Sequence, residues 1–264
     1  CDFNQLLYQG LFEAAGYSKN RFNTLQIAIQ FPYSDLKQWK SEGMTLAEMQ
    51  SIFICGSKLD ERTPMNERNS LLNELIGHYD KQSYTKKKFN VDWQLFRIRP
   101  SNHPLTRILQ HSILIYDSFD SSLLDSVIKA FSVPINDESH KLITKNLHNL
   151  LIGQGTKHSY KIGNKHLDVL VVNIVIPIVI LFGEKMGYQK LVEAAWQIYR
   201  EHRALTTNYI EDQLKKKYLS DPQQKLIGQK AIYQQGLLRL YTEYCQHHNC
   251  DYCEKNKKAL ISDM

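Results

Sequence analysis

The chain has 264 residues, of which 42% are hydrophobic and 23% are charged. This composition excludes a disordered chain, and the length supplies one sizeable core or two small ones at most. Lysine and arginine outnumber aspartate and glutamate by 33 to 27, an excess that permits contact with nucleic acid or another polyanion without requiring it.

Apolar residues at helical spacing predict an all-α fold, a multi-helix bundle or array of about eight to ten helices within a single helical domain over residues 1–264. Glycine and proline are sparse, at 12 and 7 residues, which argues against a turn-rich β fold. Thr45 and Glu48 have the spacing of a capping box. In chain order, helices are predicted over residues 2–31 with a break at Gly16, and over residues 46–55, 71–79, 104–119 and 123–131.

The second half of the chain is less regular. Residues 132–165 hold Pro134 and three glycines, so they are predicted as an irregular excursion with a short β-hairpin near residues 157–162. The apolar run 167–182 contains Asn173 and Pro177 and is shorter than the roughly 20 residues of a bilayer span. It is therefore predicted to be a buried core helix with a buried, hydrogen-bonded Asn173, and no membrane partner is expected. Further helices are predicted over residues 188–200 and 224–245.

Cys245, Cys250 and Cys253 lie within nine residues near the C-terminus, in the stretch YCQHHNCDYC. Thiolates at such short spacing are typical ligands of zinc or an iron–sulfur cluster, and His247 or His248 is a candidate fourth ligand. The alternatives are three cysteines without metal and a redox Cys-x-x-Cys pair, although the βαβ context of the redox motif is absent from the sequence pattern. The odd total of five cysteines indicates a reducing compartment, and we expect a cytoplasmic protein.

The stretch RIRPSNHPLTR, residues 97–107, carries three arginines before and inside a predicted helix start. Proline is favoured at the first position of a helix, and the exposed amides of such a terminus attract anions. Arg97, Arg99 and Arg107 are therefore predicted to contact phosphates, and Asn102 to shape the start of the helix. The alternative is that these arginines tie helices together through carboxylates and carbonyls.

Basic side chains are concentrated around this stretch. Residues 80–107 hold seven basic side chains and two acidic ones. Trp93 and Phe96 interleave with them, as aromatic residues do on surfaces that combine phosphate contacts with base stacking.

The sequence contains no complete motif of a known catalytic site. Gly153-Gln154-Gly155 lacks the remaining residues of a dinucleotide loop or a P-loop. Neither Gly-x-Ser-x-Gly nor His-Glu-x-x-His occurs. An enzyme complete within this chain is therefore not predicted.

Several stretches resemble the bacterial domain of unknown function 2851 family. They occur in the family's order at residues 7–14 (LYQGLFEA), 16–21 (GYSKNR), 97–107, 172–177 (VNIVIP) and 234–245 (QQGLLRLYTEYC), followed by Cys250 and Cys253. Ser101 departs from the family pattern, where alanine is more common. The resemblance implies a longer protein in which a restriction-endonuclease-like region precedes these helices, so an absent N-terminal domain is an expected partner. No activity is attached to the family, and the nuclease is an analogy.

From these observations we expect an accessory helical domain that binds nucleic acid or another polyanion in support of an upstream nuclease-like domain. The alternative is a purely structural or protein-interaction module with a cysteine-bound structural metal. Arg97 and Arg99 distinguish the two, because the structural module requires them buried against carboxylates.

Overall fold

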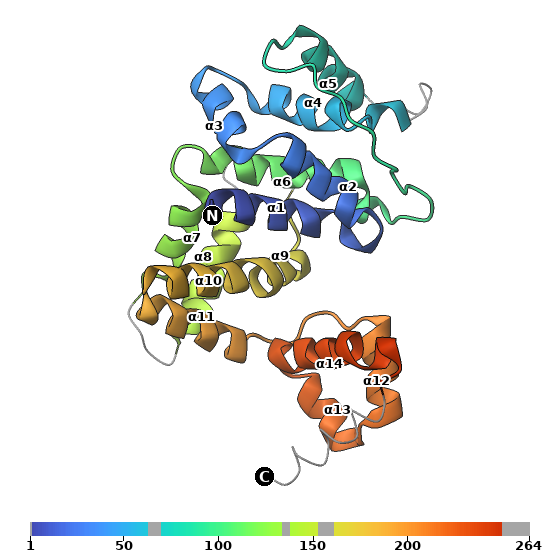
Figure 1. The fold of residues 1–264 in the computed structure, drawn as a ribbon, viewed down its shortest axis with the longest axis vertical. Helices are drawn as coiled ribbons and strands as arrows, with labels where there is room; N and C mark the ends of the chain where they lie inside the picture. The colour runs from blue at the N-terminus through green and yellow to red at the C-terminus, as the bar shows by residue number, and fades with distance from the viewer. Residues whose placement is uncertain (1, 63–69, 134–137, 153–160, 250–264) are drawn as a thin grey trace. The chain divides into compact units, whose positions relative to one another are not determined.

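The computed structural model describes residues 2–62, 70–133, 138–152 and 161–249, and within these ranges the protein is all-α, as predicted (Figure 1). The described part holds the α-helices α1 to α14, more than the expected eight to ten. Its only β feature is an isolated antiparallel bridge between Arg203 and Lys230. The chain divides into two compact units, Cys1–Val192 and Glu193–Met264.

The first unit holds the first ten helices and the start of the eleventh. The π-helical segment η5 (Val171–Val175) joins two of them. The helices are α1 (Phe3–Ala15), α2 (Tyr17–Gln30), α3 (Tyr33–Ser41), α4 (Leu46–Gly56), α5 (Ser70–Lys81), α6 (Pro104–Ser118), α7 (Leu123–Phe131), α8 (Ser139–Ile152), α9 (Asn164–Leu170), α10 (Ile176–Met186) and α11 (Gln189–Glu201).

Helix α1 lies at the centre of this unit, where it contacts α2, α3, α6, α7 and α10. The Asp2 side chain caps its start by accepting hydrogen bonds from the first-turn amides. The apolar face that α1 buries is formed by residues one turn apart. These residues are Leu7, Tyr8, Leu11, Phe12 and Ala15.

Helix α1 runs antiparallel to the continuous helical run Asn164–Met186. At the start of α1, the Phe3 ring lies 5.1 Å from the Phe182 ring near the end of that run. Beyond the end of α1, the Tyr17 ring stacks 5.3 Å from the His166 ring near its beginning. Contacts at both ends fix the alignment of these two segments.

The π-helical segment η5 lies where the apolar run meets the middle of α1. A Cβ built on Gly10 of α1 would lie 2.7 Å from Cγ2 of Ile174, so glycine permits this close approach. The segment ends two residues before Pro177, whose missing N–H interrupts regular α-helical bonding. Asn173 is exposed here, so the predicted buried asparagine is wrong: the side chain projects from the solvent-facing side of the run.

By length and composition, Asn164–Met186 is the one helical run of the described residues that is long and apolar enough to cross a membrane. In the window that meets this criterion, 67% of the residues are buried inside the fold. The core helix of a soluble protein meets the same criterion, so the finding is weak evidence for a membrane span.

Several predicted elements are confirmed. The Thr45 Oγ1 accepts a hydrogen bond from the Glu48 amide at 3.3 Å, and the Thr45 amide donates to the Glu48 carboxylate at 2.8 Å. This capping box opens α4, most of which is buried. Helix α6 begins with Pro104 as its first residue, and α7 has the predicted bounds.

The prediction of an irregular segment over residues 132–165 is wrong for its central part. Residues Ser139–Ile152 form helix α8. Ile143, Leu147 and Leu151 are buried at four-residue spacing along one face of α8, and this stripe stabilises the helix by packing. Residues 153–160, which hold most of the predicted hairpin, lie outside the described residues, and residues 161 and 162 are not in a strand.

The second unit contains the rest of α11, helices α12 (Tyr209–Tyr218), α13 (Asp221–Ile227) and α14 (Ala231–Glu243), and the short 3-10 helix η6 (Cys245–His247). The single helix predicted over residues 224–245 is therefore wrong. It is divided after α13 because Gly228 and the bridge at Lys230 interrupt it.

The interior of the second unit contains a buried ion pair between Lys215 and Glu211 on α12. The Gln234 amide, on α14, donates to both Glu211 carboxylate oxygens at 3.0 and 3.1 Å. Glu211 is 1% exposed and Gln234 is 2% exposed. The paired charge and the amide therefore satisfy each other inside the unit and join α12 to α14.

Candidate anion-binding pocket

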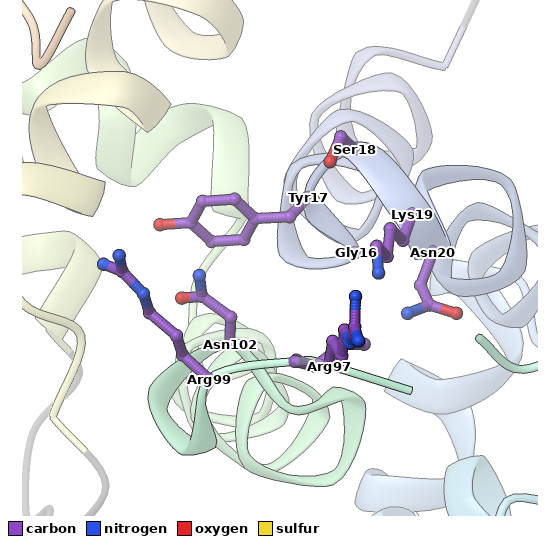
Figure 2. A pocket seen from close by; sticks show the side chains of 9 residues that line it. Gly16, Tyr17, Ser18, Lys19, Asn20, Arg97, Arg99 and Asn102 are labelled. Atoms are coloured by element: carbon purple, nitrogen blue, oxygen red, sulfur yellow. The ribbon is translucent and has the colours of Figure 1, made fainter. Parts of the chain in front are cut away.

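A pocket of about 250 Å³ opens between the start of α2 and the segment that precedes α6. Figure 2 shows Tyr17, Lys19 and Asn20 of α2 on one side of it, with Arg97, Arg99 and Asn102 across from them. The structure thus brings the GYSKNR and RIRPSN stretches together around one pocket, although they are about 80 residues apart in the sequence. The lining residues are Gly16, Tyr17, Ser18, Lys19, Asn20, Arg97, Ile98, Arg99 and Asn102.

The turn between α1 and α2 depends on Gly16. A Cβ at this position would lie 2.2 Å from the carbonyl oxygen of Asn20 and 2.4 Å from Oγ1 of Thr24, so no side chain fits. Tyr17 follows with φ at +49°, a left-handed conformation that is costly for a large side chain. This conformation turns the chain directly into α2 and places the Tyr17 ring in the pocket wall.

Two asparagines of α2 hold the opposite wall in place. The Asn20 amide donates to the carbonyl oxygen of Gln94 at 2.9 Å, and its Oδ1 accepts from the Gln94 backbone amide at 3.0 Å. One turn later, Asn23 donates to the carbonyl oxygen of Asp92 at 2.8 Å. We call these three bonds the asparagine clamp. Asn20 and Asn23 are buried, so the clamp fixes the segment with little competition from water.

The two aromatic residues predicted to stack on bases differ in exposure. Trp93 is 5% exposed, and its indole N–H donates to the Ser57 carbonyl at 2.9 Å, so it anchors the segment. Phe96 is 75% exposed. The Lys19 ammonium donates to the Phe96 carbonyl at 3.0 Å, which fixes the backbone under the exposed ring.

Arg97 and Arg99 lie at the surface of the pocket, and both are exposed. Arg97 adopts a left-handed φ of +54°, and its guanidinium carbon lies 5.0 Å from the centre of the Phe96 ring. Neither arginine forms an ion pair with any residue in the described ranges. Two cationic side chains are therefore available to a ligand.

Arg107 occupies a different place, behind the pocket wall. It is 5% exposed, and its guanidinium donates to the Tyr17 hydroxyl at 3.2 Å, to the Asn102 side-chain oxygen at 2.9 Å and to the Gln110 side-chain oxygen at 3.2 Å. It also lies 4.9 Å from the centre of the Tyr17 ring. Arg107 therefore supports Tyr17 and Asn102, two of the side chains that line the pocket.

Two histidines complete the interior behind Tyr17. The His166 ring stacks on Tyr17 with an interplanar angle of 16°, and the His111 ring lies 5.4 Å from His166. The pKa of His111 is lowered to about 4, mainly by burial; the bond to the Arg107 carbonyl opposes this shift, and the Arg107 charge adds to it. Burial, with the charges of His111 and Arg107, lowers the pKa of His166 to about 2. Both imidazoles are therefore neutral at pH 7.

Sequence patterns did not indicate this interior. His111 and His166 have no motif spacing, and Asn20 and Asn23 are ordinary helix residues until their partners on residues 92–94 are known. The helical spacing of Arg107 and His111, four residues apart on α6, was the one available signal.

The predicted metal ligands lie in the second unit. Cys245 is part of η6, and Cys250 and Cys253 lie outside the described residues. Within the described ranges, no three histidine, cysteine, aspartate or glutamate side chains are grouped as a metal site. The predicted zinc or cluster therefore stays a prediction from sequence spacing.

Comparison with known proteins gives one match. Residues 1–207 match a family model described as "Protein of unknown function (DUF2851)". No curated protein and no solved structure matches the chain.

Proposed function

Since the chain belongs to the DUF2851 family, whose function is unknown, we propose from the pocket itself that this protein binds the phosphate groups of a nucleic acid or another polyanion. In the longer proteins that the family resemblance implies, this helical part would hold nucleic acid beside the upstream nuclease-like domain. That second part of the proposal rests on the resemblance alone.

One observation carries the proposal. Arg97 and Arg99 line a pocket together with Lys19, and its other lining residues are neutral, with no carboxylate among them. The paired N–H donors of a guanidinium group match the oxygens of a phosphate, as they match those of a carboxylate. Helix α2 also begins at this pocket, and the first-turn amides of a helix favour an anion.

A second pocket, of about 290 Å³, differs from the first because an acidic residue lines it. It contains Glu61, whose carboxylate lies 3.3 Å from the Lys88 ammonium. This carboxylate offsets the nearby positive charge and would repel an anion. Its lining residues are Lys58, Glu61, Arg62, Asn90 and Val91.

The pocket is also preorganised. The asparagine clamp fixes the segment that leads into one wall. Arg107, which lies behind the pocket, holds Tyr17 and Asn102 in place through hydrogen bonds. Because these groups are ordered before a ligand arrives, binding loses less conformational entropy than it would in a mobile loop.

The alternative of a purely structural module required Arg97 and Arg99 to be buried against carboxylates. Both side chains are exposed, and among the described residues neither forms an ion pair. These placements favour the polyanion proposal over the structural one.

The proposal is tested with a fluorescein-labelled DNA oligonucleotide at low salt, by fluorescence anisotropy. We expect the wild-type protein to bind and the affinity to fall as salt rises, because binding releases counterions from phosphates. The double variant Arg97→Gln/Arg99→Gln should bind at least about tenfold more weakly. In this variant, the slope of log affinity against log salt concentration should become less negative by roughly 0.7 to 0.9 for each phosphate that is no longer neutralised.

The matched control is Lys129→Gln/Lys145→Gln, which removes the same charge from two exposed side chains on α7 and α8. It should keep most of the affinity and the salt slope. If the wild-type chain binds no polyanion at low salt, or if the two double variants bind equally weakly, the proposal is wrong.

A further inference from the structure

Phe96 lies next to the pocket on a two-residue turn, and the residue is 75% exposed. An exposed phenylalanine is common by itself, but this one stands on a rigid support. The Lys19 ammonium binds its carbonyl, and the clamp holds Gln94 two residues earlier. The ring is therefore displayed to solvent by a fixed backbone.

Further exposed aromatic rings alternate with the cations of the pocket. On α2, Tyr17 is 40% exposed and Phe22 is 67% exposed. Phe22 follows Lys19 by three residues, so the two side chains share one face of the helix. Because Lys19 itself contacts the backbone of Phe96, this face of α2 adjoins the turn that carries the Phe96 ring.

This pattern matches one class of polyanion. Single-stranded nucleic acids have unpaired bases that stack on aromatic side chains while their phosphates meet basic groups. The bases of a duplex are already stacked and paired, so they offer no face to a protruding ring. A polyanion without bases would gain nothing from Phe96.

Resting on the proposed function, we infer that the ligand is a single-stranded nucleic acid with one phosphate in the pocket and an adjacent base stacked on Phe96. Arg97 and Arg99 contact the phosphate. The Arg97 guanidinium joins the two parts of this site, because it lies over the Phe96 ring, 5.0 Å from its centre, and can bind the phosphate beside it. The other face of the ring is left for the base.

The test compares three probes with the whole chain: a twelve-residue oligothymidylate, a DNA duplex of the same length and inorganic polyphosphate. We expect the oligothymidylate to bind more tightly than the duplex. Phe96→Leu should weaken oligothymidylate binding by about 5- to 100-fold, the range expected when one base can no longer stack on an aromatic ring. The same variant should leave polyphosphate binding unchanged, whereas Arg97→Gln/Arg99→Gln should weaken both.

Tyr188→Leu provides the matched control for removal of an exposed aromatic ring. Tyr188 is 51% exposed and packs 5.7 Å from Phe182, which in turn contacts Phe3 at the start of α1. The pocket lies at the other end of α1, about 20 Å away at 1.5 Å per residue. This variant should bind all three probes like the wild type.

The outcomes separate the two proposals. Equal binding of duplex and single strand, with no effect of Phe96→Leu, overturns the single-strand inference and leaves polyanion binding in place. Equally weakened binding of all probes in Phe96→Leu also overturns it, because the ring would then act only through the fold. Failure of all three probes to bind the wild type overturns both proposals.

Discussion

His111 and His166 are buried as neutral imidazoles beside the Arg107 guanidinium. Their pKa values in the folded protein, about 4 and about 2, lie below the ordinary value of 6.5. The unfolded chain therefore binds protons between pH 6.5 and pH 4 that the folded chain does not bind. It follows that this contribution to stability is complete above pH 6.5 and is lost as the pH falls.

We predict that the free energy of unfolding falls by about 2 kcal/mol for each of these histidines between pH 6.5 and pH 5. Urea denaturation at the two pH values measures the change. His111→Gln should make this decrease smaller, because glutamine does not titrate. An unchanged pH dependence in His111→Gln would contradict this account.

At the level of single residues, the sequence indicated the basic side chains of the pocket but not their surroundings. Arg97 and Arg99 are exposed, as the proposed phosphate binding requires, whereas Arg107 is covered by Tyr17, Asn102 and Gln110. Exposure depends on residues brought together by the fold, and the helical position of Arg107 alone does not determine it. The same reason explains why Trp93, similar to Phe96 in its sequence context, is buried.

Two of the predicted helices have a local start signal in the sequence. The capping box at Thr45 and Glu48 marked α4, and proline marked α6. The prediction failed for α8, where glycines and a proline on both sides suggested a loop, although the apolar stripe was present. It also failed for α3, and for α12 although the Asn208 side chain caps the start of α12 by accepting a hydrogen bond from the Glu211 amide. Helix α7, which is nine residues long like α3, was predicted with its observed bounds, so length alone does not explain these failures.

The stripe on α8 gives a matched pair of substitutions in one helix. Leu147 is 0% exposed, and Leu142 is 46% exposed. We predict that Leu147→Ala lowers the free energy of unfolding by about 2 to 5 kcal/mol, because it removes buried methyl groups and leaves a cavity. Leu142→Ala should change it by less than about 1 kcal/mol. Urea denaturation compares the two variants, and equal effects would show that α8 does not pack through the Leu147 face.

The C-terminal cysteine motif begins in η6, directly after α14. We predict near-stoichiometric zinc, or iron with visible absorption, when the chain is purified without oxygen, because three thiolates at this spacing favour soft metals. Elemental analysis measures the content, and Cys250→Ser should lose the metal whereas Cys55→Ser should retain it. If the wild-type chain contains no metal, the three cysteines are ordinary thiols and the predicted metal site is wrong.

For the whole molecule, the all-α class followed from composition and periodicity, while its division into two compact units did not. The boundary, between Val192 and Glu193, falls inside α11, and no glycine, proline or polar linker marks it in the sequence. The family match covers residues 1–207, so it includes all of the first unit and stops before α12. The pocket lies entirely within the matched part.

The asparagine clamp binds main-chain atoms of residues 92 and 94, not their side chains. Substitutions at Asp92 and Gln94 can therefore change what stands beside the pocket without loosening its frame. Sequence changes that alter ligand preference can therefore accumulate at these positions without lowering the stability of the fold. The two buried asparagines keep the backbone beside the pocket in place while the side chains there evolve.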